Sequence, residues 1–187
     1  MSPRHVALIG RARSGKDTAA ARLTGEHLYT RVAFADPLKD LALSVDPIVS
    51  AEPGHFGYLP TRLSAVVKRE GWERAKSRPE VRRTLQHLGQ AIRDVDPFFW
   101  VSIALSKLDV ASRWNLPVVV TDCRYRNEAD ELRARGFLIV RIVRPDLSEQ
   151  PGSEHVSETE LDDYPEDAVI HNSSTLQDLW AQLDALI

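Results

Sequence analysis

Compact apolar runs alternate with stretches of helical periodicity along this chain. The runs His5–Ile9, Leu116–Asp122 and Phe137–Val143 are rich in aliphatic, largely β-branched residues, which is typical of strands buried on both faces of a parallel sheet. Shorter runs at Thr30–Phe34 and Ala168–Ile170 predict two further strands. Strands that alternate with helices predict a three-layer α/β domain with a largely parallel sheet.

The segments between these runs carry apolar residues at helical spacing. A first helix is expected to begin near Lys16, and a second runs from Pro37 through Leu43. Further helices are expected over Thr61–Ala75, Pro79–Val95, Pro97–Ser112, Tyr125–Arg135 and Leu176–Ile187. The segment Val45–Pro60 is rich in Pro, Gly and Ser, which predicts an irregular connection.

The charged residues are distributed unevenly. All 24 Lys and Arg precede Pro145, together with 16 of the 27 Asp and Glu, whereas residues 145–187 contain the other 11 acidic residues. A cationic body suits polyanionic ligands. The basic residues are scattered among the predicted helices without a recognition-helix or zinc-finger pattern, so stable nucleic-acid binding is not expected.

Cysteine content and hydropathy fit a protein of the cytoplasm. The single cysteine, Cys123, cannot form an internal disulfide, and no Cys/His cluster suggests a metal site. No apolar run approaches the ~18 residues that span a bilayer. No signal-peptide pattern precedes the first strand. We therefore expect a cytoplasmic protein without a membrane partner.

The segment from Gly10 to Thr18 stands where the first strand ends and the first helix begins. It matches G-x-x-x-x-G-K, whose glycines let backbone N–H groups curl around a phosphate and whose lysine neutralises phosphate oxygens. A tight turn without a ligand is the weaker interpretation, because Arg11, Arg13 and Lys16 would crowd it with positive charge. We predict that the phosphates of ATP are bound by Gly10, Arg11, Ala12, Arg13, Ser14, Gly15, Lys16, Asp17 and Thr18.

Polar residues after Lys16 and at the end of the Leu116–Asp122 run are candidates for holding Mg²⁺. Asp17 replaces the Ser or Thr that usually follows the lysine, so we expect Thr18, or Asp17 through water, to help hold the metal. Asp122 closes its strand as a Walker B aspartate does, and Cys123 follows where ATPases often carry a water-activating Glu. N-K-x-D and D-x-x-G motifs for guanine nucleotides are absent. Group transfer from ATP is therefore favoured over hydrolysis or a GTPase switch.

Besides the phosphate loop, the chain contains a set of distinctive segments in a fixed order. They are Phe34–Asp40, Val81–Gly89, Phe99–Trp100, Asp122–Glu128, Val143–Pro145, His155–Glu158 and Val169–Asn172. Together they resemble the deoxynucleoside monophosphate kinases of tailed bacteriophages over nearly the whole chain. The resemblance implies a single P-loop kinase domain over residues 1–187, with a helical acceptor-binding region at about 37–112 and a lid at about 145–167.

The resemblance also implies a site for the phosphate of the acceptor. Arg82 and Gly89 would line this site. Arg82 suits the role because a guanidinium offers two parallel donors to a phosphate. Arg83 and Arg93 are the alternative candidates for this contact with the phosphate, since one of two adjacent arginines on a helix faces solvent.

Two further acceptor residues each carry an alternative interpretation. By resemblance Trp100 would pack against the base or sugar of the acceptor, and an indole face stacks on any base. Ordinary core packing beside Phe98 and Phe99 is the alternative. Asp36 either accepts hydrogen bonds from hydroxyl groups of the acceptor or caps the helix that starts at Pro37.

The segment after the Leu116–Asp122 run resembles the polar edge of a reaction centre. Asp122 would orient water on Mg²⁺, Arg124 would meet charge on the transferring phosphoryl group, and Arg124 and Glu128, beside Asn127, would contact the acceptor. A surface salt bridge between Arg124 and Glu128 at helical spacing is the alternative. The expected catalytic residues are Lys16, Arg13, Asp122 and Arg124.

Residues 145–167 depart from the wider kinase pattern because they contain no arginine. His155, Ser157 and Glu158 resemble a lid motif, although Ser157 with Glu160 also fits a helix capping box. By analogy with related kinases, His171 and Asn172 would lie near the adenine of ATP. Cations for the transition state are then expected from Arg11, Arg13, Lys16, Arg124, Arg126 and Arg144.

The expected reaction transfers the γ-phosphoryl group of ATP·Mg to a deoxynucleoside monophosphate and gives ADP and the diphosphate, in the host cytoplasm if a phage encodes the chain. No general base is required, because the acceptor oxygen is already anionic. The alternatives are a dephosphocoenzyme A or phosphomevalonate kinase, and a nucleotide-binding protein without catalysis, which the missing lid arginines favour. The sequence does not decide the preferred base, the sugar selectivity or whether the chain forms a homodimer.

Overall fold

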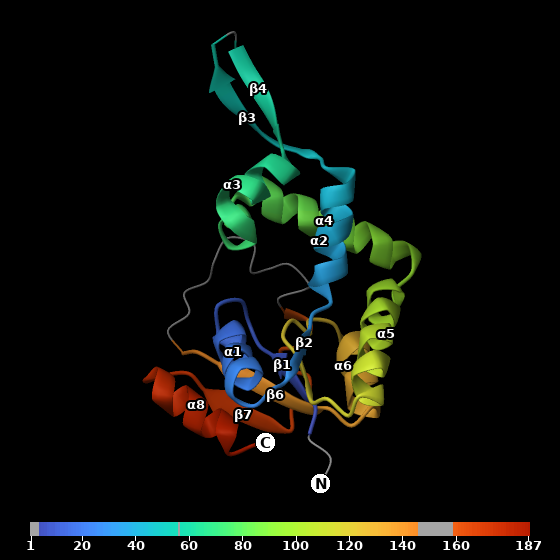
Figure 1. Ribbon diagram of the computed structural model, residues 1–187, viewed down its shortest axis with the longest axis vertical. Helices are drawn as coiled ribbons and strands as arrows, with labels where there is room; N and C mark the ends of the chain where they lie inside the picture. The colour runs from blue at the N-terminus through green and yellow to red at the C-terminus, as the bar shows by residue number, and fades with distance from the viewer. Residues whose placement is uncertain (1–3, 56, 146–158) are drawn as a thin grey trace. The chain divides into compact units, whose positions relative to one another are not determined.

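The computed structural model describes residues 4–55, 57–145 and 159–187. The chain divides into two compact units (Figure 1). Unit 1 consists of residues 1–34 and 101–187, and unit 2 of residues 35–100.

Unit 1 is built on a five-stranded parallel sheet in the order β2-β5-β1-β6-β7. The strands are β1 (Val6–Ile9), β2 (Thr30–Val32), β5 (Val118–Val120), β6 (Leu138–Val143) and β7 (Ala168–His171). In the pairing of β1 with its two neighbours, Ala7 lies opposite Val120 of β5 and Ile139 of β6. Because the strands are parallel, the carboxyl ends of β1, β5 and β6 meet at one edge of the sheet.

Helices cover both faces of this sheet. Figure 1 shows α1 (Lys16–Glu26) and α8 (Leu176–Asp184) on one side and α5 (Phe99–Arg113) and α6 (Arg126–Ala134) on the other. The apolar core is accordingly split into two clusters, one on each face. The strand β1 is buried along its whole length, as a strand between two helical layers must be. The three-layer α/β prediction is confirmed for unit 1.

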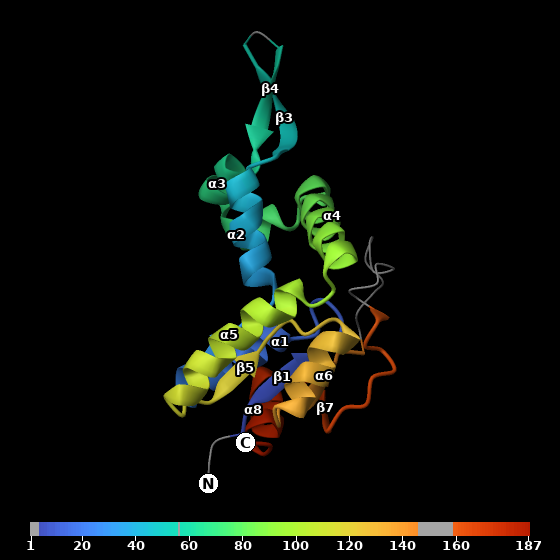
Figure 2. The same ribbon diagram turned by 90° about the vertical axis from the view of Figure 1, so that its right-hand side faces the viewer.

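Unit 2 is mainly helical. It contains α2 (Ala35–Val45), α3 (Leu63–Ala75) and α4 (Pro79–Val95), and a hairpin of β3 (Ile48–Gly54) with β4 (Gly57–Arg62) extends from these helices (Figure 2). A small core of Ala42, Val49, Leu63, Val66, Ala75 and Val81 holds these elements together. The helix predicted over Pro79–Val95 is found with the same bounds.

The hairpin corrects the prediction of an irregular connection over Val45–Pro60. The two strands pair antiparallel, with Pro53 opposite Tyr58 and Ala51 opposite Pro60. Prolines normally argue against a strand because they lack an N–H donor. A two-stranded sheet has only edge strands, so a proline whose missing N–H would face solvent costs no ladder hydrogen bond. The Pro and Gly content therefore gave a misleading signal.

The acidic end of the chain is joined to arginines of the cationic part by ion pairs within unit 1. The pairs are Asp162–Arg11, Asp163–Arg126, Glu166–Arg141, Asp167–Arg133 and Asp184–Arg22. These pairs offset part of the charge asymmetry along the sequence. Among the helices that the structure describes, none combines the length and apolar character needed to cross a membrane.

Candidate active site

The phosphate loop links the carboxyl end of β1 to the start of α1. Gly10 has φ 130°, and a Cβ built there would lie 2.5 Å from the carbonyl oxygen of Ile142. Gly15 has φ 112°, and a Cβ there would lie 2.6 Å from Nδ2 of Asn172. Both positions therefore require glycine, for backbone conformation and for space. Because these positions are glycines, the loop can pass close to the ends of β6 and β7.

Lys16 begins α1 and leaves only 7% of its surface exposed. Its Nζ donates to the carbonyl oxygens of Gly10 at 2.7 Å and Arg11 at 2.8 Å. The ammonium is thus held across the mouth of the loop. Phosphate oxygens are stronger acceptors for an ammonium than neutral carbonyls are. The lysine is therefore in place to exchange a loop carbonyl for a phosphate.

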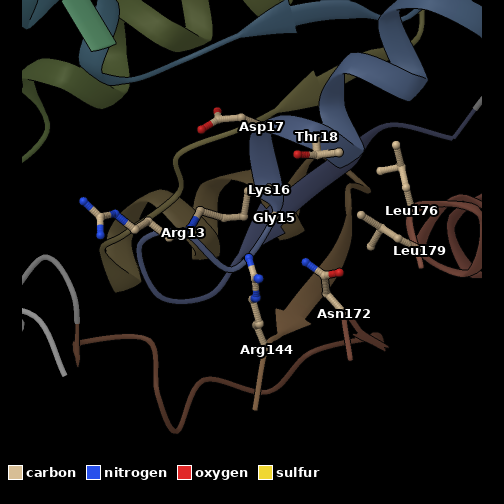
Figure 3. Close-up of a pocket in the computed structure, with 9 residues that line it drawn as sticks. All are labelled: Arg13, Gly15, Lys16, Asp17, Thr18, Arg144, Asn172, Leu176 and Leu179. Atoms are coloured by element: carbon tan, nitrogen blue, oxygen red, sulfur yellow. The ribbon is translucent and has the colours of Figure 1, made fainter. Parts of the chain in front are cut away.

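A pocket of about 340 Å³ opens beside this loop (Figure 3). Its lining combines cationic, polar and apolar side chains from the loop, from the ends of β6 and β7, and from α8. The lining residues are Arg13, Gly15, Lys16, Asp17, Thr18, Arg144, Asn172, Leu176 and Leu179. Five of the predicted ATP-binding loop residues lie together in this pocket, and Asn172 joins them.

The pocket also contains three residues outside the predicted ATP-binding set. Arg144 was predicted only as one of several candidate cations, and Leu176 and Leu179 were expected only as part of a helix. Arg144 follows β6, which pairs with the phosphate-loop strand β1. Residues that follow neighbouring parallel strands converge at one edge of the sheet. The sequence does not give the strand order, so it could not place Arg144 beside the phosphate loop. In Figure 3 the side chain of Arg144 extends toward Gly15 and Lys16.

Arg13 has an unusual backbone conformation for a residue with a large side chain. Its φ is 63°, in the left-handed region, and its side chain is exposed at the pocket. Left-handed conformations of non-glycine residues cost free energy and cluster at functional sites. Leu28, Asp46 and Asn115 also have a positive φ, and of these four residues only Arg13 lines the pocket.

Asn172 follows β7 and braces the phosphate loop. Its carboxamide nitrogen donates to the carbonyl oxygen of Ser14 at 2.8 Å, and the side chain also lines the pocket. The neighbouring residue His171 is exposed, and its backbone N–H and carbonyl are both bonded to the side chain of Gln182. Asn172 thus touches the part of the pocket beside the phosphate loop, and its expected contact with adenine stays a prediction.

Asp122 follows β5, next to the phosphate-loop strand. Its Oδ1 accepts a hydrogen bond of 2.8 Å from the backbone N–H of Phe34. Asp17 and Thr18 line the pocket from the first turn of α1. A hydroxyl and carboxylates are the oxygen ligands that Mg²⁺ prefers.

Asp17 and Thr18 fit a Mg²⁺ ion that binds together with a nucleotide, whereas Asp122 is not among the residues that line the pocket. The described part of the chain has no cluster of three or more His, Cys, Asp or Glu side chains suited to a metal ion. Mg²⁺ is commonly held by one or two protein oxygens, several waters and substrate phosphates. The donor set found here is of that kind.

Glu128 caps α6 from a buried position. The residue is 1% exposed, and its Oε2 accepts from the backbone N–H groups of Arg124 at 2.8 Å and Tyr125 at 3.2 Å. The sequence predicted that Glu128 either contacts the acceptor or forms a surface salt bridge, and neither prediction included this capping role. The cap fixes the backbone at Arg124, in the segment that leads from β5 to α6. The geometry supports an indirect role for Glu128.

The predicted acceptor residues of α4 share one face of that helix. Arg82, Gly89 and Arg93 are spaced by seven and four residues, which brings side chains onto the same helical face. Arg82 and Arg93 are half-buried and Gly89 is buried. Arg83, one position away, is exposed and pairs with Glu80 on the helix surface. Arg82 is thus less exposed than Arg83, as expected for two adjacent arginines of which one faces solvent.

Trp100 and Gly89 are joined within unit 2. The indole Nε1 of Trp100 donates to the carbonyl oxygen of Gly89 at 3.2 Å, and Trp100 is 2% exposed. A Cβ on Gly89 would lie 3.1 Å from Cδ2 of Leu38, so the glycine lets α2 and α4 approach closely. In this arrangement Trp100 and Gly89 pack helices together, which agrees with the core-packing alternative for Trp100.

Asp36 lies in the first turn of α2. Its Oδ1 accepts a hydrogen bond of 2.9 Å from Nζ of Lys39, one helical turn later. Both side chains are partly exposed. Contact of Asp36 with the acceptor stays a prediction.

The segment expected to form a lid is packed at its carboxyl end. Leu161 and Tyr164 are buried in the core of unit 1, and Arg141 donates to both of their carbonyl oxygens, at 2.9 and 2.6 Å. Leu161 and Tyr164 are thus held in unit 1, and the lid expected over residues 145–167 stays a prediction. His155, Ser157 and Glu158 lie outside the described residues.

Comparison with known proteins places the chain in a family. A model of the deoxynucleotide monophosphate kinase family matches residues 62–183. This chain belongs to that family. The family match includes the face of α4 with Arg82, the Asp122–Glu128 segment, and Asn172.

Individual relatives of the chain come from phages and other viruses. Uncharacterized protein ORF77 of Ictalurid herpesvirus 1 (strain Auburn) is 37% identical over 53% of this chain and 44% of its own length. The deoxynucleotide monophosphate kinase of Enterobacteria phage T4 is 31% identical over 55% of this chain and 43% of its own length. A putative deoxynucleotide monophosphate kinase of Acanthamoeba polyphaga mimivirus is 26% identical over 95% and 93%. The chain thus spans under half the length of the first two relatives and most of the third.

Proposed function

We propose that this protein transfers the γ-phosphoryl group of ATP to a deoxynucleoside monophosphate and releases ADP and the deoxynucleoside diphosphate. The observation that carries the proposal is the pocket beside the phosphate loop, where Lys16, Arg13 and Arg144 gather around the start of α1. Membership of the deoxynucleotide monophosphate kinase family supports the acceptor class.

On the donor side, the triphosphate would lie at the amino end of α1. The first N–H groups of a helix lack partners within the helix, and the helix dipole adds partial positive charge there. Lys16 would exchange a loop carbonyl for a β or γ oxygen, while Arg13 approaches from the loop. Leu176 and Leu179 offer an apolar surface for the base or sugar at the other end of the pocket.

Thr18, Asp17 and Asp122 would hold Mg²⁺ together with water and the phosphates. When bound there, the ion supplies positive charge to the β and γ oxygens. The protein's own contribution is placement, since Asp122 is oriented by the N–H of Phe34 and Arg124 by the buried cap Glu128.

On the acceptor side, Arg82 would hold the monophosphate from the half-buried face of α4, with Arg93 about three turns further along that face. The acceptor oxygen is already anionic, so the reaction needs alignment and charge neutralisation rather than a general base. A general base is therefore not needed at the position after Asp122, where the chain has Cys123, a buried thiol.

The test is ADP release in a coupled assay with ATP, Mg²⁺ and one acceptor at a time. The acceptors are the four common deoxynucleoside monophosphates, their ribonucleotide counterparts, dephosphocoenzyme A and phosphomevalonate. The proposal predicts turnover with at least one deoxynucleoside monophosphate and little without acceptor. Turnover only with dephosphocoenzyme A or phosphomevalonate would replace the acceptor class. ATP binding without turnover on any acceptor would favour a non-catalytic nucleotide-binding protein.

A further inference from the structure

Six cations were candidates for the charge that lid arginines supply in other nucleoside monophosphate kinases. Three of them are directed elsewhere or held by the fold. Arg11 pairs with Asp162 at 2.8 Å, Arg126 pairs with Asp163, and neither side chain lines the pocket. The backbone of Arg124 is held by Glu128, and its side chain is also absent from the pocket lining.

The remaining three line the pocket, and they differ in what already holds them. Lys16 is buried and bonded to two loop carbonyls. Arg13 and Arg144 are exposed, and within the described residues neither has a hydrogen-bond or ion-pair partner for its guanidinium. Elsewhere in unit 1 several arginines are paired with carboxylates from the acidic end of the chain.

Sheet register explains why Arg144 reaches the phosphate loop. Ile9, the last residue of β1, pairs with Arg141 of β6, so residues 142–144 run beside the start of the loop. The close approach of Gly10 to the carbonyl oxygen of Ile142 is the same contact seen from the loop. Arg144 and Arg13 thus enter one pocket from two different elements (Figure 3).

We infer that Arg144 binds the phosphates of the donor nucleotide, opposite Arg13, and takes the place of the missing lid arginines. A guanidinium suits this position because its planar fork donates two parallel hydrogen bonds to phosphate oxygens. The apolar residues Leu176 and Leu179 lie on the far side of Asn172 from Arg144 in Figure 3, which leaves the base to that end. The inference rests on the proposed function for the identity of the ligand.

The test uses a ligand without a base. Binding of inorganic tripolyphosphate and of adenosine is measured by titration calorimetry for the wild type, Arg144→Ala, Arg144→Lys and Arg113→Ala. Arg113 is an exposed arginine at the end of α5, outside the pocket lining, and its variant removes the same charge. Arg144→Ala should weaken tripolyphosphate binding by about 10- to 100-fold relative to Arg113→Ala, and Arg144→Lys should recover part of the loss. Adenosine binding should not change.

Several results would overturn this assignment. The first is a tripolyphosphate affinity of Arg144→Ala within about threefold of that of Arg113→Ala. The second is a loss of affinity confined to adenosine, which would place Arg144 at the base. The third is failure of the wild type to bind tripolyphosphate. Acceptor-dependent turnover is measured on the same proteins. A wild type that binds tripolyphosphate through Arg144 but phosphorylates no deoxynucleoside monophosphate would keep this inference and refute the proposed function.

Discussion

The side-chain nitrogen of Asn172 donates a hydrogen bond of 2.8 Å to the carbonyl oxygen of Ser14, across 158 residues of chain. This bond holds the phosphate loop against the end of β7, at the point where Gly15 leaves room for the amide. The curvature of the loop therefore depends on a residue that the phosphate-binding motif does not contain.

Asn172→Ala should weaken binding of a non-hydrolysable ATP analogue by about fivefold, because one loop hydrogen bond of ~1 kcal/mol is lost. Titration calorimetry measures the affinity. Ser173→Ala, an exposed neighbour, is the control. Equal affinities for the two variants would show that the brace is not needed for nucleotide binding.

Arg82→Ala should reduce kcat/KM for the acceptor while binding of ATP is retained. A charge-assisted contact with a phosphate is worth about 2–4 kcal/mol, or roughly 30- to 1000-fold in kcat/KM. Arg83→Ala removes the same charge from an exposed position and should cost much less. Kinetics with both substrates and a melting curve are compared for the two variants. Greater sensitivity at Arg83 would mean that the acceptor site lies on another face of α4.

Glu128→Gln should lower kcat by about tenfold with little change in KM for ATP. Both backbone N–H groups donate to the same carboxylate oxygen, and a neutral amide oxygen in its place is a weaker acceptor, so the backbone at Arg124 is held less firmly. Glu131→Gln, one turn later on α6 and partly exposed, is the control. A fall in melting temperature without a fall in kcat would assign Glu128 a purely structural role.

Acid should loosen the contact between α1 and α8. Hydrogen bonds from Arg22, and also from His27, hold the pKa of Asp184 below its usual value of 3.8. A carboxylate with a lowered pKa in the folded state stabilises the protein fully above its ordinary pKa, and this is lost as pH falls through the lower value. The melting temperature should therefore drop below about pH 4, and less so in Asp184→Asn. Parallel curves for both proteins would contradict this role.

Burial decided which parts of the fold were visible in the sequence. β5 and β6 were predicted because strands covered on both faces are continuous apolar runs. The hairpin of β3 and β4 was not, since edge strands tolerate Pro53 and Pro60. The packed part of the acidic segment was also missed. Its anchors, among them the bonds from Arg141 to the carbonyls of Leu161 and Tyr164, join residues about 20 positions apart that no local pattern connects.

The candidate site shows the same division. The phosphate loop could be predicted because glycine, lysine and a strand-to-helix junction are adjacent in sequence. Arg144, Leu176 and Leu179 could not be assigned to nucleotide binding, because their place in the pocket depends on strand order and on the position of α8. Glu128 was singled out through the resemblance of the Asp122–Glu128 segment, but only the structure shows its carboxylate bonded to the backbone.

The central claim is tested most directly by following the label of [γ-³²P]ATP in the presence of Mg²⁺ and each deoxynucleoside monophosphate, for the wild type and Lys16→Met. The account predicts that the wild type moves the label into a deoxynucleoside diphosphate, while Lys16→Met melts at a similar temperature and transfers almost none. Label released as inorganic phosphate, or transfer by Lys16→Met within a few-fold of the wild type, would contradict it.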